Sequence, residues 1–123
     1  MSYELQFDVI DKILRVEIRG NRTAGDLSGN AIAAWSKVAT VCNENKLSRI
    51  LVVSHATGKY PSLNAYEINS VLEECGIERS WKIAFVNLDM ESYQDIEFGE
   101  IVAVNRGFQV KVFPTEDAAR AWL

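Results

Sequence analysis

The segment Ser54-His55-Ala56-Thr57-Gly58-Lys59-Tyr60 carries the densest set of side chains that could do chemistry. It holds the only histidine of the chain, two hydroxyls and a lysine. A histidine beside a hydroxyl can act as a general base that activates a nucleophile, so one hypothesis is a small hydrolase or transferase using His55. Adjacent residues of an extended chain point in opposite directions, however, so Ser54 and His55 are not expected to pair. No orienting carboxylate lies nearby in the sequence, which favours a hydrophilic loop whose hydroxyls bind backbone groups.

The same loop does not match a phosphate-binding loop, and no other stretch predicts a metal or cofactor site. Thr57-Gly58-Lys59 lacks the required upstream glycine, and Tyr60 stands where a metal-binding hydroxyl is needed. One histidine and two separated cysteines do not form a zinc set. An acidic run has helical spacing rather than that of a calcium loop, which indicates a solvated helix face. Its members are Asp89, Glu91, Asp95, Glu97 and Glu100.

Size and composition predict one globular domain spanning residues 1–123. A net charge of -4 argues against nucleic acid as a partner, since affinity for phosphates depends on Lys and Arg. Cys42 and Cys75 belong to no Cys-x-x-Cys pair and are expected to be buried free thiols, which suits a reducing cytoplasm. The first residues resemble no signal peptide, and no apolar run is long enough to span a bilayer. We therefore expect a cytoplasmic protein.

The apolar patterns predict an α/β fold of the order ββαβαβαβα. Residues 4–19 alternate between apolar and polar on both sides of Asp11-Lys12, which indicates an antiparallel hairpin. Apolar runs at 49–53, 82–86 and 109–113 predict buried strands, and helical spacing predicts helices between them. The later strands should be largely parallel, giving a mixed, mostly parallel sheet flanked by helices. The predicted helices cover about 23–45, 62–75, 91–105 and 116–123.

Several finer expectations concern caps and burial. Thr23 is predicted to cap the first helix, with Asp26 three residues on as in a capping box. Trp35 and Trp122 are expected in the core, whereas Trp81 precedes a strand and is expected to be partly exposed. The terminal helix ends on large apolar groups and is expected to dock on the domain and complete the fold. The second helix is predicted to bury Leu63, Ile68, Val71, Leu72 and Cys75.

Ligands of open α/β sheets gather beyond the carboxyl ends of the parallel strands, which here are the segments 54–60, 87–89 and 113–115. Tyr93, Ile96 and Phe98 also crowd apolar groups into an acidic stretch. If they are not all buried, they form a patch that could meet a partner protein, a membrane surface or a second subunit. The candidate binding residues are Ser54, His55, Thr57, Tyr60, Tyr93, Ile96 and Phe98.

Four stretches carry a resemblance to a known family: residues 82–86, Asn105-Arg106-Gly107, residues 110–113 and residues 116–123. With the opening hairpin they make the chain resemble the STAS-like family, named for sulphate transporters and anti-sigma-factor antagonists. The closer similarity is to its short stand-alone bacterial branch, which is related to Sec14-type lipid-binding domains. The resemblance spans nearly the whole chain and rests on architectural motifs.

This resemblance implies a regulatory or binding module rather than an enzyme. We expect a non-enzymatic module for a partner protein or a lipid-like apolar ligand, with peripheral membrane contact and a homodimer as further options. The antagonist branch implies the alternative of a phosphorylation-controlled regulator, with a hydroxyl in an Asp-Ser-Ser/Thr-Gly-Leu-like loop. The corresponding loop here retains Thr57-Gly58 but lacks the preceding acid and the following leucine. The hydroxyls to consider for modification are Ser54, Thr57 and Ser62.

Overall fold

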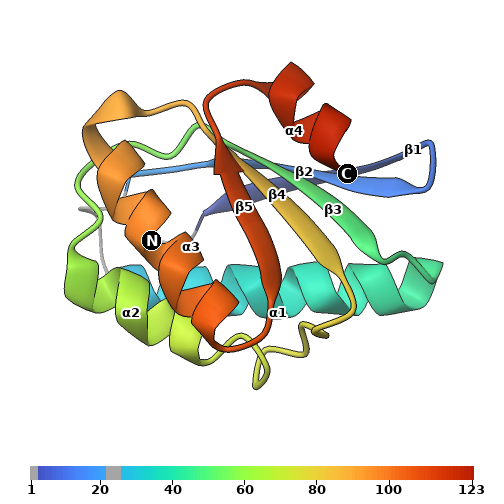
Figure 1. Cartoon of the computed structure of the whole chain (residues 1–123), viewed down its shortest axis with the longest axis horizontal. Coiled ribbons are helices and arrows are strands. Elements are labelled where there is room, and N and C mark those ends of the chain that lie inside the picture. The colour runs from blue at the N-terminus through green and yellow to red at the C-terminus, as the bar shows by residue number, and fades with distance from the viewer. Residues whose placement is uncertain (1–2, 22–25) are drawn as a thin grey trace.

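The fold is that of an α/β domain with a five-stranded sheet and four α-helices (Figure 1). The structure, a computed structural model, describes residues 3–21 and 26–123. The strands are β1 (Glu4–Ile10), β2 (Ile13–Arg19), β3 (Arg49–Ser54), β4 (Lys82–Asn87) and β5 (Gln109–Phe113). The helices are α1 (Leu27–Asn45), α2 (Ser62–Ser70), α3 (Tyr93–Asn105) and α4 (Glu116–Trp122), with a 3₁₀ turn η1 (Met90–Ser92) before α3. The predicted order of elements and the mixed, mostly parallel sheet are confirmed.

The strands lie side by side in the order in which they occur in the chain, β1-β2-β3-β4-β5. The β1–β2 hairpin is antiparallel and places Phe7 opposite Val16, while β2 to β5 run parallel. Asp11 and Lys12 form its turn with φ angles of 52° and 63°. Positive φ at both turn residues is the geometry that twists with the strands of a two-residue hairpin, so this turn sets the register.

Three helices cover one face of the sheet and one helix covers part of the other. Consecutive right-handed crossovers between neighbouring parallel strands return to the same side, which places α1, α2 and α3 together. Figure 1 shows α1 and α2 on one side of the sheet and α4 on the opposite side. The helix α4 contacts β3, β4 and β5. On that opposite side α4 also reaches β2, since Arg15 of β2 donates hydrogen bonds to Glu116 of α4.

The core divides in the same way. On the side of α1, buried residues of β2 to β5 such as Val16, Val52 and Ile83 pack against the three helices. On the other side, Leu51 and Val86 pack against Ala119 of α4, with Trp122 and Leu123 at the edge. The predicted docking of the terminal helix is thus confirmed, and Thr115 caps that helix by accepting a hydrogen bond from the Ala118 N–H at 3.3 Å.

The first helix begins at Leu27, and its N-cap residue is Asp26. The Asp26 carboxylate accepts a hydrogen bond from the Gly29 N–H at 3.1 Å, which satisfies one of the unpaired donors of the first turn. Thr23 itself lies outside the described residues.

The second helix is shorter than predicted, because it ends at Ser70 and the chain continues as turns to Gly76. Ile68, Leu72 and Cys75 are buried as predicted, and Val71 packs against the core from a half-buried position. The prediction for Leu63 was wrong, since its side chain is 76% exposed. Ala65 takes the inward position instead, three residues before Ile68 on the same helix face.

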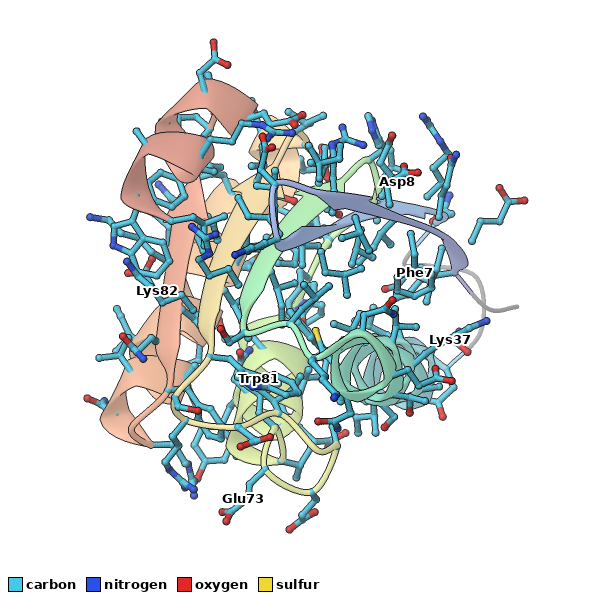
Figure 2. All side chains as sticks on the ribbon, turned by 90° about the vertical axis from the view of Figure 1, so that its right-hand side faces the viewer. Phe7, Asp8, Lys37, Glu73, Trp81 and Lys82 are labelled. Atoms are coloured by element: carbon cyan, nitrogen blue, oxygen red, sulfur yellow. The ribbon has the colours of Figure 1, made fainter. Side chains whose placement is uncertain are left out.

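The prediction for Trp81 was also wrong, since its side chain is buried among residues of α1, α3 and the strands. Trp81 and the following residue Lys82 point to opposite sides of β4 (Figure 2). Lys82 donates a hydrogen bond to the Trp122 carbonyl at 2.8 Å on the α4 side. Trp35 and Trp122 pack against the core from half-buried positions, as expected.

Candidate functional site

A cavity of about 40 Å³ lies between α1 and the sheet, where β2, β3 and β4 reach their carboxyl ends. This is the end of the sheet at which the sequence predicted a binding site. Its wall is apolar and aromatic apart from one serine and two tyrosine hydroxyls. The lining residues are Tyr3, Ile18, Ala31, Ala34, Trp35, Val38, Val52, Ser54, Ala56, Tyr60 and Phe85.

A second cavity of about 30 Å³ lies beside the first, between the sheet and the α2–α3 pair. The two cavities share the side chains of Trp35, Tyr60 and Phe85. The rings of Trp35 and Phe85 have their centroids 6.3 Å apart and are tilted by 37°. Only these aromatic side chains are common to both walls, so movement of the three rings would join the cavities into one elongated space.

Three of the candidate binding residues border these cavities. Ser54 and Tyr60 line the first cavity, and Ile96 together with Tyr60 lines the second. Ser54 is 1% exposed, and its hydroxyl accepts a hydrogen bond from the Ala56 N–H at 3.3 Å. A hydroxyl at this position faces the cavity and is not accessible to a protein kinase in solution. The phosphorylation hypothesis therefore rests on Thr57 and Ser62, which are exposed.

The other candidates lie elsewhere. Thr57 bridges to Asn21 beyond the end of β2, and its N–H donates to the Gly20 carbonyl at 3.0 Å. Tyr93 is half-buried against the core, where desolvation and the nearby Glu97 raise the pKa of its phenol. Phe98 is 37% exposed and Ile96 is buried, so these aromatic and apolar groups do not form one continuous exposed patch.

His55 points to the opposite face of the sheet from Ser54, as the extended backbone predicts. Its Nε2 atom lies 3.0 Å from Oε2 of Glu17 on β2. Glu17 is the orienting carboxylate that the sequence did not reveal, because 38 residues separate the two. The carboxylate also accepts hydrogen bonds from Arg15 at 2.6 Å and Arg19 at 3.2 Å. The Glu17 carboxylate is thus shared between the imidazole and two guanidinium groups. Among the described residues, none of the side chains that bind Glu17 carries a hydroxyl that could serve as a nucleophile.

The network continues from Arg15 to α4. The Nε and Nη2 atoms of Arg15 both donate hydrogen bonds to the Glu116 carboxylate at 3.0 Å, which makes a bidentate pair. Arg120 donates two further hydrogen bonds to the same carboxylate, at 2.9 and 3.1 Å. Side chains of β2 therefore hold the first turn of α4 over the sheet. We interpret this network as the polar attachment of α4, complementing the apolar contacts of Ala119 and Trp122.

Titration of this network predicts acid sensitivity. Hydrogen bonds from Arg15, with a further contribution from Arg120, lower the pKa of Glu116 to about 2, and Arg15 likewise lowers the pKa of Glu17. A carboxylate whose pKa is depressed on folding stabilises the fold above its ordinary pKa, and this contribution is lost as the pH falls toward the folded value. For Glu116 the loss should therefore fall between about pH 4.5 and pH 2.

We expect Glu116→Gln to remove part of this pH dependence. The difference in free energy of unfolding between pH 7 and pH 3 should shrink by about 1–2 kcal/mol, a value reduced for the partial solvent exposure of the pair. Urea unfolding followed by far-ultraviolet circular dichroism at the two pH values measures it. An unchanged difference would show that Glu116 does not stabilise the fold through its charge.

The cysteines are buried free thiols, as predicted. Burial raises the pKa of the Cys42 thiol to about 11, so it stays protonated at neutral pH and is no nucleophile. Among residues 3–21 and 26–123, no three His, Cys, Asp or Glu side chains gather closely enough to hold a metal ion. No helix in the described part of the chain is both long and apolar enough to cross a bilayer.

Sequence reasoning missed most of the cavity wall. Phe85 was assigned only to a buried strand, and Trp35, Ala31 and Ala34 only to the apolar stripe of the first helix, while Tyr3 drew no notice. The one signal for Ala31 and Ala34 is their small size at positions three residues apart on the buried face of α1. Small side chains leave room where larger ones would fill the interface.

No protein-family model matches the chain, and no curated protein shows significant similarity to it. The STAS-like resemblance, the cytoplasmic location, and the partner-protein, membrane and homodimer hypotheses therefore stay predictions.

Proposed function

We propose that this domain is a non-enzymatic binding module for a small apolar ligand that enters between α1 and the sheet. The observation that carries the proposal is the apolar cavity at the carboxyl ends of β2 to β4. Natural binding sites are typically apolar concavities with a few polar groups that orient the ligand. Ser54, Tyr3 and Tyr60 supply such groups here.

The energetic argument is that the cavity costs stability while it is empty. Protein interiors are normally packed as densely as organic crystals, so space of this kind is rare. At roughly 24 cal/mol per Å³, a closed cavity of about 40 Å³ would cost about 1 kcal/mol, which is an upper bound for this cavity because it opens to solvent. A ligand that fills the space restores the missing contacts, and the domain would gain stability on binding.

The size of the cavity limits what fits without rearrangement. A volume of about 40 Å³ takes only a short apolar group, since a single water molecule needs about 10–15 Å³ by the same measure. A longer ligand has to displace Trp35, Tyr60 and Phe85 and extend into the second cavity. We therefore expect the aromatic rings to move when a larger ligand binds.

Filling the cavity from the protein side should abolish binding. We expect Ala31→Leu to weaken the binding of an apolar fluorescent probe, such as an anthroyloxy fatty acid, by at least about tenfold, because a few methylene groups of ligand burial are lost. The matched control is Thr40→Leu, which adds the same side chain at an exposed position of α1. Probe titration of the purified protein measures the dissociation constants.

The same experiment includes a search for a ligand that co-purifies, by native mass spectrometry and solvent extraction. Binding of the probe with equal affinity by Ala31→Leu and Thr40→Leu would place the probe outside the cavity. Absence of any co-purified molecule, together with absence of probe binding, would refute the proposed function.

A further inference from the structure

The first cavity has a route to solvent along α1. A surface groove runs between β1 and α1, lined by Tyr3, Leu5, Asn30, Ala33, Ala34 and Lys37. The groove and the cavity share Tyr3 and Ala34. These two residues therefore separate the cavity from the groove, and a ligand longer than the cavity would reach the groove past them.

The groove has a different chemistry from the cavity. Among the described residues that line the groove, Lys37 is the one charged residue and none carries a carboxylate. Figure 2 shows Lys37 on α1 at the outer surface, on the side of the helix toward Phe7 of β1. Lys37 is exposed and forms no ion pair with the residues that the structure describes. The charged amine is thus available to a ligand although the chain as a whole is acidic.

The cavities and the groove together form an elongated path, which fits a linear ligand. At one end the apolar cavity adjoins, at Trp35 and Phe85, a second cavity whose wall is mostly apolar but includes Asn69 and Glu100. At the other end it adjoins a groove with a single cation among its described lining residues. A compact apolar molecule uses only the first cavity, whereas a single alkyl chain can follow the whole path. The end of that chain emerging beside Lys37 is best completed by a negative charge.

We propose that the ligand is a single-chain amphiphile with an anionic head group, whose chain enters the cavity and whose head binds Lys37. This inference rests on the proposed function, because it assigns the chemical class of the ligand for the same cavity. Burial of the chain supplies most of the affinity. The exposed ion pair is weaker and provides selection among head groups, on the order of a few-fold in affinity.

The test compares three decyl compounds below their micelle concentrations: decanoate, decan-1-ol and decyltrimethylammonium. The chain is constant and the head is negative, neutral or positive. We expect decanoate to bind about threefold to fivefold more tightly than the alcohol, and the cation to bind most weakly. Displacement of the fluorescent probe measures all three dissociation constants on the same protein.

A charge reversal at the groove should reverse this order. In Lys37→Glu, decyltrimethylammonium should bind more tightly than decanoate, with the affinity for decanoate reduced about tenfold. The control is Lys111→Glu on β5, which changes the net charge equally at an exposed position whose side chain contacts Phe113, on the α4 side. This control should keep the order found for the unaltered protein, since only a local ion pair distinguishes the two variants.

The outcomes separate the two proposals. Equal affinities for the three compounds, or an order that Lys37→Glu leaves unchanged, would overturn the assignment of an anionic head group while leaving an apolar-ligand module. Failure of all three compounds to displace a bound probe would overturn this inference alone, whereas absence of probe binding and of any co-purified molecule would overturn the proposed function with it.

Discussion

Replacement of Trp81 by Ala is expected to lower the free energy of unfolding by about 3–5 kcal/mol. The side chain is only 4% exposed and belongs to the main core beneath α1, together with Cys42, Leu72 and Phe108. Removing the indole leaves a large cavity among residues of several elements, and these residues cannot all close over it. Since domains of this size are stable by about 5–15 kcal/mol, the substitution should remove a large fraction of the total stability.

The matched comparison is Leu63→Ala, which we expect to change the free energy of unfolding by less than about 0.5 kcal/mol. Leu63 is 76% exposed on α2, so its truncation removes little buried surface. The loss of unfolding free energy for Trp81→Phe should fall between those of the other two variants, since the smaller ring fills part of the space. This variant also allows the measurement if Trp81→Ala does not fold. Urea unfolding monitored by circular dichroism gives all three values. A larger loss for Leu63→Ala than for Trp81→Phe would contradict the burial described above.

The positions of Leu63 and Trp81 could not be predicted from the sequence. The pattern from Leu63 to Cys75 fits a helix of four turns, but α2 ends at Ser70 and the chain turns back toward Gly76. Helical periodicity therefore placed Leu63 on the buried face of α2, although its side chain is exposed. Leu72 and Cys75 are buried as predicted, but they lie in the turns after α2 and not in the helix. Trp81 lies outside any periodic segment, and its burial depends on α1 passing beneath the start of β4, which local sequence does not encode.

The fold itself was predictable because its signals are local and repeated. Strict alternation around Asp11-Lys12 defines the hairpin, and short apolar runs separated by helical segments define the parallel strands. The right-handed crossover then decides which face each helix covers. The strand order required the structure, since each βα unit can be added on either side of the growing sheet.

The end of the sheet at which the candidate cavity lies could be predicted, but most of its lining residues could not. Ser54 and Tyr60 follow from the rule that ligands lie beyond the carboxyl ends of parallel strands. The pairing of His55 with Glu17 depends on the register of β2 and β3, in which Ile18 stands opposite Ser54. Empty space depends on how side chains fit in three dimensions, so residues such as Trp35 and Phe85 could be assigned to the core but not to the wall of a cavity.

The second large effect is expected for Arg15→Ala, which should lower the free energy of unfolding by about 2–3 kcal/mol. The guanidinium is 18% exposed and donates three hydrogen bonds, two to Glu116 and one to Glu17. Removing one partner of a buried ion pair typically costs about 3–5 kcal/mol because the other charge is left unpaired. Here each carboxylate keeps another cation, Arg120 for Glu116 and Arg19 for Glu17, so the loss should be smaller.

The double variant Arg15→Met/Glu116→Leu separates charge from packing. Apolar side chains of similar volume often replace a buried ion pair at little cost, so this variant should regain most of the stability that Arg15→Ala loses. Its stability between pH 7 and pH 3 should also vary less than that of the unaltered protein, because the carboxylate with the depressed pKa is gone. A double variant no more stable than Arg15→Ala would mean that α4 depends on the specific geometry of the bidentate pair.

Arg15→Ala also tests whether the two faces of the sheet act independently. Arg15 and α4 lie on one face, whereas the cavity lies on the other, beneath α1. Affinity for the apolar probe should therefore stay within about twofold of the unaltered protein, since sites without shared partners are usually energetically additive. A loss of affinity parallel to the loss of stability would show that docking of α4 sets the position of β3, and through β3 the shape of the cavity.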